Sequence, residues 1–339
     1  MSGLEVQGLV ARRGSFELGP IDLEIPPGTA TALLGPSGAG KTTLLRAIAG
    51  FLPLSAGRIL WQGRPVDDEP PERRRFGFVP PNLGLFPNYR VRANVAYPLR
   101  IAGRSDVEER VQHWLRRFDL EPFAARYPAE LSSGERQRVA MARALAAEPA
   151  ALLWDEPLAA LDVDSRDGLM RLLRELLETE RVPLVLVTHD PATAAALASH
   201  YAVVSAGRVR FVGDPGEFAR APLDRFTARF LGFENLYGSH EIEGAGGRPF
   251  AALLRAMAGP AGVVVPPSAI RWTPVAGAEG RVAAVRPTPA GWVVALRDGG
   301  LTFHVTVPGP VPGVRVGDAV ELSLDEHLLR PLERGGEPA

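Results

Sequence analysis

Short apolar runs alternate with amphipathic stretches along the first two thirds of the chain. Three apolar runs have the length of buried strands: residues 30–34, 150–154 and 182–188. Leucines at residues 169–177 recur at helical spacing, which is typical of a helix packed on a core. A capping-box pattern, Ser132 with Glu135, predicts a helix that runs to about Ala147. This alternation predicts an α/β fold with a mostly parallel sheet and helices on its faces.

Three local patterns add detail to this outline. Ser105 and Glu108 form a second capping-box pattern, which predicts a helix that begins at Ser105. Asp190, followed by proline, predicts the start of another helix. The basic run at residues 73–75 follows Glu72, and we interpret it as a solvated loop and not as a nucleic-acid surface.

After residue 233 the pattern changes to short strands. These are expected at residues 262–265, 281–285, 292–296, 301–307 and 319–324. Asp298-Gly299 predicts a tight hairpin turn. We therefore expect an α/β domain at residues 1–232, with a helical subdomain at about 84–147, and a small all-β, OB-like barrel domain at residues 233–339.

Composition narrows the function classes. The chain has 339 residues, a formal net charge of -1 and no cysteine. The charge gives no basic field for nucleic acid, and the lack of cysteine excludes disulfides and thiolate chemistry. Residues 1–7 lack the features of a signal peptide, and no apolar run approaches the ~18 residues of a membrane span. A cytoplasmic location is expected.

The most specific chemical signal follows the run at residues 30–34. It fits the phosphate-loop pattern G-x-x-x-x-G-K-[ST] and comprises Gly35, Pro36, Ser37, Gly38, Ala39, Gly40, Lys41, Thr42 and Thr43. A helix is expected from Lys41 to Ala49, ended by Gly50. Backbone N–H groups of such a loop point at phosphate oxygens, Lys41 would reach the β- and γ-phosphates of ATP, and the Thr42 hydroxyl would bind Mg²⁺.

Polar residues follow the ends of all three apolar runs. The phosphate loop follows Leu34, Asp155 and Glu156 follow Trp154, and His189 follows Thr188. Ligands of parallel sheets bind beyond the carboxyl ends of the strands. We therefore expect these groups to converge at one edge of the sheet.

Four further segments resemble the motifs of ABC-type ATPases, in the same order and spacing. They are LSSGERQR at 131–138 (signature), ALLWDEP at 151–157 (Walker B), ALD at 160–162 (D-loop) and VTHD at 187–190 (switch histidine). On this resemblance, which covers residues 1–232, the chain is similar to ABC transporter ATP-binding subunits.

The resemblance implies a role for each matched residue. Asp155 would hold Mg²⁺ with Thr42, Glu156 would activate the attacking water, and His189 would contact the γ-phosphate beside Lys41. In the family the signature segment closes over the ATP of a second copy. A homodimer is therefore implied, and its shared sites would include Ser132, Ser133, Gly134 and Asp162.

Two positions depart from the family pattern. Pro81 stands where these families carry a glutamine, and its neighbour Asn82 is the nearest polar replacement. This puts the coupling of hydrolysis to transport in question. The aromatic residue that stacks on adenine is missing; Arg13 falls near its place, where a guanidinium plane could stack, and Phe16 is the nearest ring.

The last third resembles the regulatory β-barrel domain of some importer ATPases, through residues 230–235 and 269–271. The implied protein is an ATPase subunit that energises import through a separate membrane permease, at the cytoplasmic face of the membrane, with an extracytoplasmic solute-binding protein as indirect partner. Molybdate or tungstate is one expected solute. Polyamine, iron or sugar import stays open, as does a weakly hydrolysing regulatory protein. DNA-repair and translation ATPases of this type are disfavoured, since the chain has no long coiled-coil insert and no second phosphate loop.

Overall fold

The computed structural model describes residues 3–158, 161, 163–180, 182–220, 223–230, 233–288, 291–311 and 313–333. The chain divides into two compact units, residues 1–218 and 219–339. This division falls before the expected domain boundary at residues 232/233, because a strand at Leu223–Asp224 already pairs with a strand near the end of the chain, at Arg330–Glu333.

The first unit combines two sheets with helices. Its strands are β1 (Leu4–Arg13), β2 (Phe16–Ile25), β3 (Ala30–Leu34), β4 (Leu54–Trp61), β5 (Arg64–Pro65), β6 (Phe76–Val79), β7 (Ala151–Asp155), β8 (Leu184–Thr188), β9 (His200–Ser205) and β10 (Arg208–Gly213). Its helices are α1 (Lys41–Ala49), α2 (Pro71–Arg74), α3 (Val91–Ile101), α4 (Val107–Arg117), α5 (Ser133–Ala146), α6 (Val163–Glu180), α7 (Pro191–Leu197) and α8 (Pro215–Arg220), the last of which crosses into the second unit.

A six-stranded sheet in the order β10-β9-β3-β8-β7-β6 forms the centre of this unit. All neighbouring pairs are parallel except β10 with β9, so the predicted mostly parallel sheet is confirmed. Every residue of β3, β7 and β8 is buried, as continuous apolar runs require. The three strands are adjacent, and their register aligns Leu34 with Thr188 and Asp155 with Val187.

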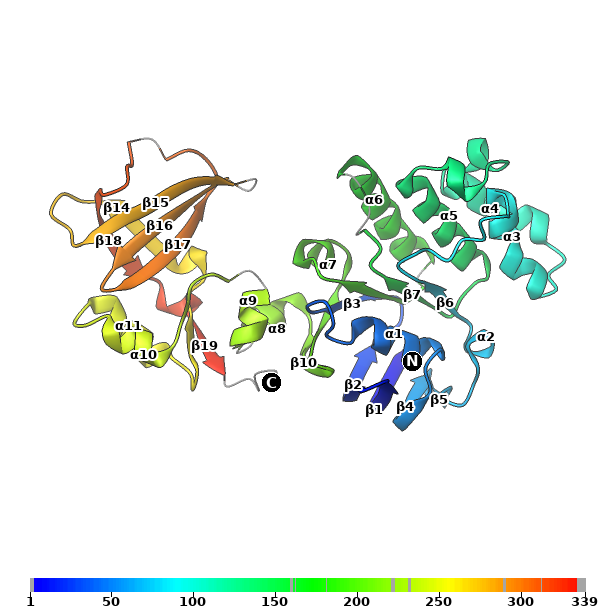
Figure 1. Ribbon diagram of the computed structural model, residues 1–339, viewed down its shortest axis with the longest axis horizontal. Helices are drawn as coiled ribbons and strands as arrows, with labels where there is room; N and C mark the ends of the chain where they lie inside the picture. Colours follow the sequence, from blue (N-terminus) through cyan, green and yellow to red (C-terminus); the bar gives the residue numbers. More distant parts are fainter. Residues whose placement is uncertain are drawn as a thin grey trace. The chain divides into compact units, whose positions relative to one another are not determined.

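A second, antiparallel sheet in the order β2-β1-β4-β5 packs on the other side of α1. Helix α1 contacts β1 on one side and β7 and β8 on the other, and a single apolar cluster joins all of them. Figure 1 shows α1 between β1 and β2 below and the central strands above. The helix that follows the phosphate loop is therefore fixed by two sheets.

Helices α3, α4 and α5 pack on one another as the helical subdomain, and they stand together at one end of the unit in Figure 1. The predicted start of α4 is wrong. The helix begins at Val107, with Asp106 as its N-cap, and not at a Ser105 to Glu108 capping box. The reason is competition for partners, because Glu108 forms an ion pair with Arg92 of α3.

The interpretation of the basic run at residues 73–75 as a solvated loop is wrong, because Arg73 and Arg74 belong to helix α2. Arg74 is only 5% exposed. Its guanidinium donates to the carbonyls of Ala47 (3.0 Å) and Ile48 (2.8 Å) at the end of α1, and to those of Asp67 and Glu69. Arg74 thus adds donors at the end of the helix, where the Ala47 carbonyl also accepts from the Gly50 N–H at 3.1 Å.

The second unit is built around a five-stranded antiparallel sheet in the order β14-β18-β15-β16-β17. Its strands are β14 (Ile270–Pro274), β15 (Gly280–Thr288), β16 (Gly291–Asp298), β17 (Leu301–Val307) and β18 (Ala319–Leu324). A four-stranded sheet in the order β11-β19-β13-β12 comprises β11 (Leu223–Asp224), β19 (Arg330–Glu333), β13 (Gly262–Val264) and β12 (Leu236–Tyr237).

The predicted strands of this unit are confirmed, and the predicted hairpin turn is present one residue further along, because Asp298 still pairs with Leu301. Gly299 and Gly300 both have positive φ, as a tight two-residue hairpin requires. Its helices were not predicted: α9 (Arg225–Phe230), α10 (Ser239–Gly244) and α11 (Pro249–Met257). Buried residues of α10 and α11 join the core of the larger sheet. These helices are short and lie between segments with strand patterns, so their apolar positions were not recognised as helical.

Candidate functional site

The phosphate loop connects β3 to α1 as predicted. The Lys41 ammonium folds back over its own loop and donates to the carbonyls of Gly35 (2.7 Å) and Pro36 (2.8 Å). The side chain is 6% exposed, and burial lowers the pKa of Lys41. The loop therefore holds a poorly solvated cation at its centre, and the negative charge of a bound phosphate would stabilise this cation.

Two glycines are required by the shape of this loop. Gly35 has φ +150°, and a Cβ there would lie 2.1 Å from the carbonyl oxygen of Val204 on β9. Gly40 has φ +104°, and a Cβ there would lie 3.0 Å from the ring of Phe16. Any larger residue would therefore push the loop away from the strands that support it.

Asp155, at the end of β7, faces the start of α1. The Thr42 hydroxyl donates to one of its carboxylate oxygens, Oδ1, at 3.1 Å. The second oxygen, Oδ2, has no hydrogen-bond partner among the described residues, although Asp155 is only 1% exposed. Burial raises the pKa of Asp155 against the opposing hydrogen bond from Thr42.

This donor set fits a magnesium ion. An unpartnered carboxylate oxygen beside a hydroxyl offers the hard oxygen ligands that Mg²⁺ prefers. The described residues contain no group of three histidine, aspartate or glutamate side chains placed to hold a metal. An ion at Thr42 and Asp155 would thus depend on phosphate oxygens and water for its other ligands.

Glu156 and His189 meet across the ends of β7 and β8. The His189 Nδ1 atom lies 3.0 Å from the Glu156 carboxylate. Glu156 has φ +55°, which costs a non-glycine residue on the order of 1 kcal/mol. Its backbone N–H donates to the carbonyl of Val187 at 3.1 Å, so the neighbouring strand holds the turn.

A hollow of about 430 Å³ lies over the loop. Its lining consists of Arg13, Phe16, Ser37, Gly38, Ala39, Gly40, Lys41, Thr42, Thr43 and Glu156. Arg13 and Phe16 are directly opposite each other in the hairpin of β1 and β2, so their side chains leave the same face. The structure therefore brings the phosphate loop and the Glu156 carboxylate into one hollow with Arg13 and Phe16, the two candidates for contact with adenine.

The signature segment lies elsewhere. Its capping box is confirmed: Ser132 N donates to the Glu135 carboxylate (2.7 Å), and Glu135 N donates to Ser132 Oγ (3.3 Å). Among the described residues, Ser132, Ser133 and Gly134 do not line the hollow. Asp162, the other residue assigned to a shared site, lies outside the described residues.

The segment after β6, which carries Pro81, is anchored by a residue that the sequence analysis missed. Arg143 of α5 donates to the carbonyls of Leu83 (2.9 Å) and Gly84 (2.7 Å). Pro81 and Asn82 are both exposed. No motif indicated Arg143, because the carbonyl groups that it binds, those of Leu83 and Gly84, lie far away in the sequence.

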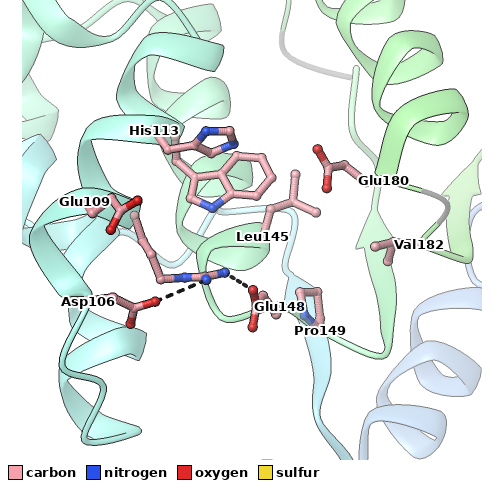
Figure 2. A pocket seen from close by; sticks show the side chains of 10 residues that line it. Asp106, Glu109, His113, Leu145, Glu148, Pro149, Glu180 and Val182 are labelled. Carbon is pink, nitrogen blue, oxygen red and sulfur yellow. Dashed lines mark hydrogen bonds and ion pairs between the residues drawn. The ribbon is translucent and has the colours of Figure 1, made fainter.

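Another hollow, of about 500 Å³, lies between α4, the end of α5 and the start of β8. Figure 2 shows Asp106 and Glu148 on its walls, and Arg110 forms ion pairs with both carboxylates. The hydrogen bond that Arg104 donates to Asp106 lowers the pKa of this carboxyl group below its ordinary value. Arg110, Asp106 and Glu148 are therefore engaged in tying α4 to the connection between α5 and β7, which makes this hollow a weaker candidate than the one over the phosphate loop.

Sequence comparisons give relatives of one kind. The ABC transporter family model matches residues 18–159. The sulfate/thiosulfate import ATP-binding protein CysA of Mycolicibacterium paratuberculosis is 43% identical over 232 residues, 68% of this chain and 64% of that protein. The Fe(3+) ions import ATP-binding protein FbpC of Streptomyces avermitilis is 45% identical over 228 residues, 67% of this chain and 66% of that protein. CysA of Bacillus cereus is 42% identical over 241 residues, 69% of this chain and 68% of that protein.

Solved structures agree with this grouping, and they cover one part of the chain. A dimeric structure of the ATP-binding cassette MJ0796, in a post-hydrolysis state with ADP and Pi, has a TM-score of 0.57 and 29% identity, over 62% of this chain and 98% of that chain. The chain spans 64% to 68% of the length of the three relatives above. Since CysA of Bacillus cereus is 42% identical over more than two thirds of its own length, this chain belongs to the ABC transporter family.

Proposed function

We propose that this chain is an ATP-hydrolysing subunit that energises solute import through a separate membrane permease. The observation that carries the proposal is the convergence, at one sheet edge, of the Lys41 loop, Asp155 and the pair of Glu156 with His189. The relatives named above are import ATP-binding proteins. No helix in the described part of the chain is long and apolar enough to cross a bilayer.

The phosphates of ATP would occupy the hollow over the loop. Lys41 would exchange the carbonyls of Gly35 and Pro36 for phosphate oxygens, and the N-terminus of α1 adds positive partial charge there. Thr42 and Asp155 would hold Mg²⁺, which when bound neutralises part of the phosphate charge. The unpartnered Asp155 oxygen supports this assignment.

Glu156 would orient and deprotonate the attacking water, and His189 would contact the γ-phosphate. Phosphoryl transfer depends mainly on positioning and on charge stabilisation, so two directed groups beside Lys41 suffice. We expect Glu156→Gln to bind ATP normally and to hydrolyse it about 10²–10⁴-fold more slowly. Turnover at the wild-type rate, measured as phosphate release under saturating ATP, would refute the assignment of Glu156 as the base.

The base of the nucleotide would rest on Arg13, which lines the hollow together with Phe16. Arg13 is exposed and lines the hollow, whereas the ring of Phe16 lies against Gly40. Stacking of a planar guanidinium on an aromatic base is a known use of arginine. This arrangement supports Arg13 as the stacking group and Phe16 as a support of the loop.

A second copy of the chain would complete the site. Ser132, Ser133 and Gly134 lie at the N-terminus of α5, which is a suitable place for an anion, yet they lie outside the lining of the hollow. In a homodimer these residues and Asp162 of one copy would close over the ATP of the other. The dimeric state named for MJ0796 supports this proposal.

The permease would dock on residues 82–100. Tyr89, Tyr97 and Ile101 expose apolar surface in or next to this segment. Its loop is well built, because the fully buried Asn94 bonds to the backbone of Phe86 and Tyr89. An exposed aromatic patch on a rigid support suits a protein partner.

The solute is best tested by elemental analysis. Sulfate/thiosulfate and Fe(3+) are the solutes in the relatives' names, and molybdate or tungstate is our candidate from the sequence. Cells without the protein would be compared with cells restored by wild type or by Glu156→Gln. Selective loss of sulfur, iron, molybdenum or tungsten, rescued only by wild type, would support ATP-driven import and name the solute. An unchanged elemental profile would refute an inorganic solute and would direct the search to polyamines and sugars.

Pro81 favours a second candidate, a nucleotide-binding regulatory protein that hydrolyses ATP weakly. Proline has neither a side-chain oxygen for Mg²⁺ nor an N–H group, and it stands in the segment that joins β6 to the helical subdomain. Replacing Pro81 by glutamine tests this. A large rise in turnover would favour the weakly hydrolysing protein, and high wild-type turnover without such a rise would favour the import subunit.

A further inference from the structure

A polar network joins α6 to the turn that carries His189. Arg166 of α6 forms an ion pair with Asp190, and its guanidinium also donates to the Thr193 hydroxyl at 2.7 Å. Thr193 in turn donates from its hydroxyl to the Asp190 carboxylate at 2.6 Å. From this geometry we infer that Arg166 is a positioning residue for His189, an inference that rests on the proposed role of His189 in hydrolysis.

The Asp190 carboxylate is held from several directions. Besides Arg166 and the Thr193 hydroxyl, it accepts the backbone N–H groups of Ala192 (3.0 Å) and Thr193 (3.2 Å). Burial works to raise the pKa of Asp190, but these hydrogen bonds and the charge of Arg166 outweigh it and lower the pKa. The N-cap of α7 is therefore fixed as a charged group with little freedom to turn.

His189 depends on this fixed cap because its own ring is poorly packed. The side chain is 57% exposed, so packing of neighbouring atoms does not set its direction. Apart from the contact of its Nδ1 atom with the Glu156 carboxylate at 3.0 Å, the backbone on either side sets the direction of the ring. The N–H of Asp190 donates to the Thr188 hydroxyl at 3.0 Å, which closes a small turn around the His189 peptide.

Arg166 acts at a distance from the reaction. It is absent from the described lining of the hollow over the loop, so it does not touch the nucleotide there. Its path to the chemistry runs through Asp190 to His189 and then to Glu156, which lies 3.0 Å from the His189 ring. Removing the guanidinium should therefore slow turnover without weakening the binding of ATP.

The chain provides a matched control on the same helix. Arg174 lies two turns further along α6 and donates to the carbonyl of Ala196, near the other end of α7, at 2.9 Å. It also ties α6 to α7, but it does not contact the cap beside His189. A purely structural contribution of these contacts would appear in both variants, whereas a positioning effect belongs to Arg166 alone.

The experiment is a double-mutant cycle on the full-length chain. Phosphate release and the Kd for ATP would be measured for wild type, Arg166→Met, Arg174→Met, His189→Ala and the double variant Arg166→Met with His189→Ala. We expect Arg166→Met to lower kcat ~10-fold with Kd changed less than ~3-fold, and Arg174→Met to stay within ~2-fold in both. In the His189→Ala background, Arg166→Met should change kcat by less than ~2-fold.

The outcomes separate the two proposals. Full turnover of His189→Ala would refute the role of His189 and, with it, this inference. Two results would overturn the positioning role alone, both with a lowered kcat in His189→Ala. One is a normal kcat in Arg166→Met, and the other is a further ~10-fold loss of kcat in the double variant. Arg166→Lys controls for misfolding, because it keeps a cation near Asp190. We expect it to recover part of kcat at an unchanged melting temperature. A kcat that falls in step with the melting temperature in all variants would overturn the inference.

Discussion

Lys41, Asp155 and Glu156 each have an environment or a conformation that their residue type disfavours. Lys41 and Asp155 are buried, Asp155 has an oxygen without a partner in the described residues, and Glu156 has a left-handed backbone. Such features persist only where the surrounding structure imposes them, and they cluster at functional sites. The motifs predicted that these residues are functional. They could not predict the strain, which depends on how β7 and β8 end side by side.

The burial of Asp155 leads to a stability prediction. Its pKa is raised in the folded state, so folding favours the protonated form and the carboxylate opposes folding at neutral pH. We expect Asp155→Asn to raise the unfolding free energy without nucleotide by on the order of 1 kcal/mol, or roughly 2–4 °C in Tm. The amide oxygen can still accept from Thr42, so little else changes.

The pH dependence of this effect follows from the sign of the shift. The loss of folding stability caused by the buried Asp155 carboxylate is fully present above the raised pKa. It disappears as pH falls toward the ordinary carboxyl pKa of about 3.9. The difference in Tm between Asp155→Asn and wild type should thus be largest at neutral pH and shrink in acid. A variant that is less stable at neutral pH would contradict the assignment of an unfavourable buried charge.

At the scale of single elements, local signals worked where they did not compete with distant partners. The bounds of β3 and α1 agree with the prediction, since a buried apolar run and a Gly50 stop in the left-handed conformation are both local features. The start of α4 was wrong because Glu108 pairs with another helix. The burial of Arg74 was missed because its acceptors lie on α1.

Arg74 provides a test at this scale. Arg74→Met removes the side-chain donors to the carbonyls at the end of α1; Ala47 keeps the Gly50 N–H as a partner, whereas the buried Ile48 carbonyl loses its donor. We expect a loss of about 2–3 kcal/mol in unfolding free energy, measured by denaturant titration. Arg73→Met is the control, because Arg73 is exposed, and it should stay within about 0.5 kcal/mol. Equal losses in both variants would contradict the structural role of Arg74.

At the scale of the whole molecule, the two compact units have separate apolar cores. One core joins the sheets around α1, and the other joins the five-stranded sheet to α10 and α11. The change in sequence pattern near residue 233 indicated two domains, although it did not show that the segment from residue 223 pairs with the strand at residues 330–333. Such a pairing is not encoded locally, because its two strands are separated by almost the entire unit.

Separate cores lead to a calorimetric prediction. We expect two unfolding transitions, only one of which responds to nucleotide. In Glu156→Gln, ATP at 100 times its Kd should stabilise the unit of residues 1–218 by about 2.7 kcal/mol, a shift of roughly 5–10 °C in one transition. Lys41→Ala should abolish this shift. A single transition, or an equal shift of both, would show that the units do not unfold independently.

The sequence by itself determined the family, the order of the main elements and the residues that carry the chemistry. These are local properties: a glycine loop before a helix, an acidic pair after a buried strand, and a histidine before a capped helix. Tertiary structure alone decided which strands are adjacent, which arginines are buried and how His189 is held. Arg74, Arg143 and Arg166 all look like ordinary surface residues in the sequence. Their partners lie on other elements, and folding is what brings a donor and a distant acceptor within hydrogen-bonding distance.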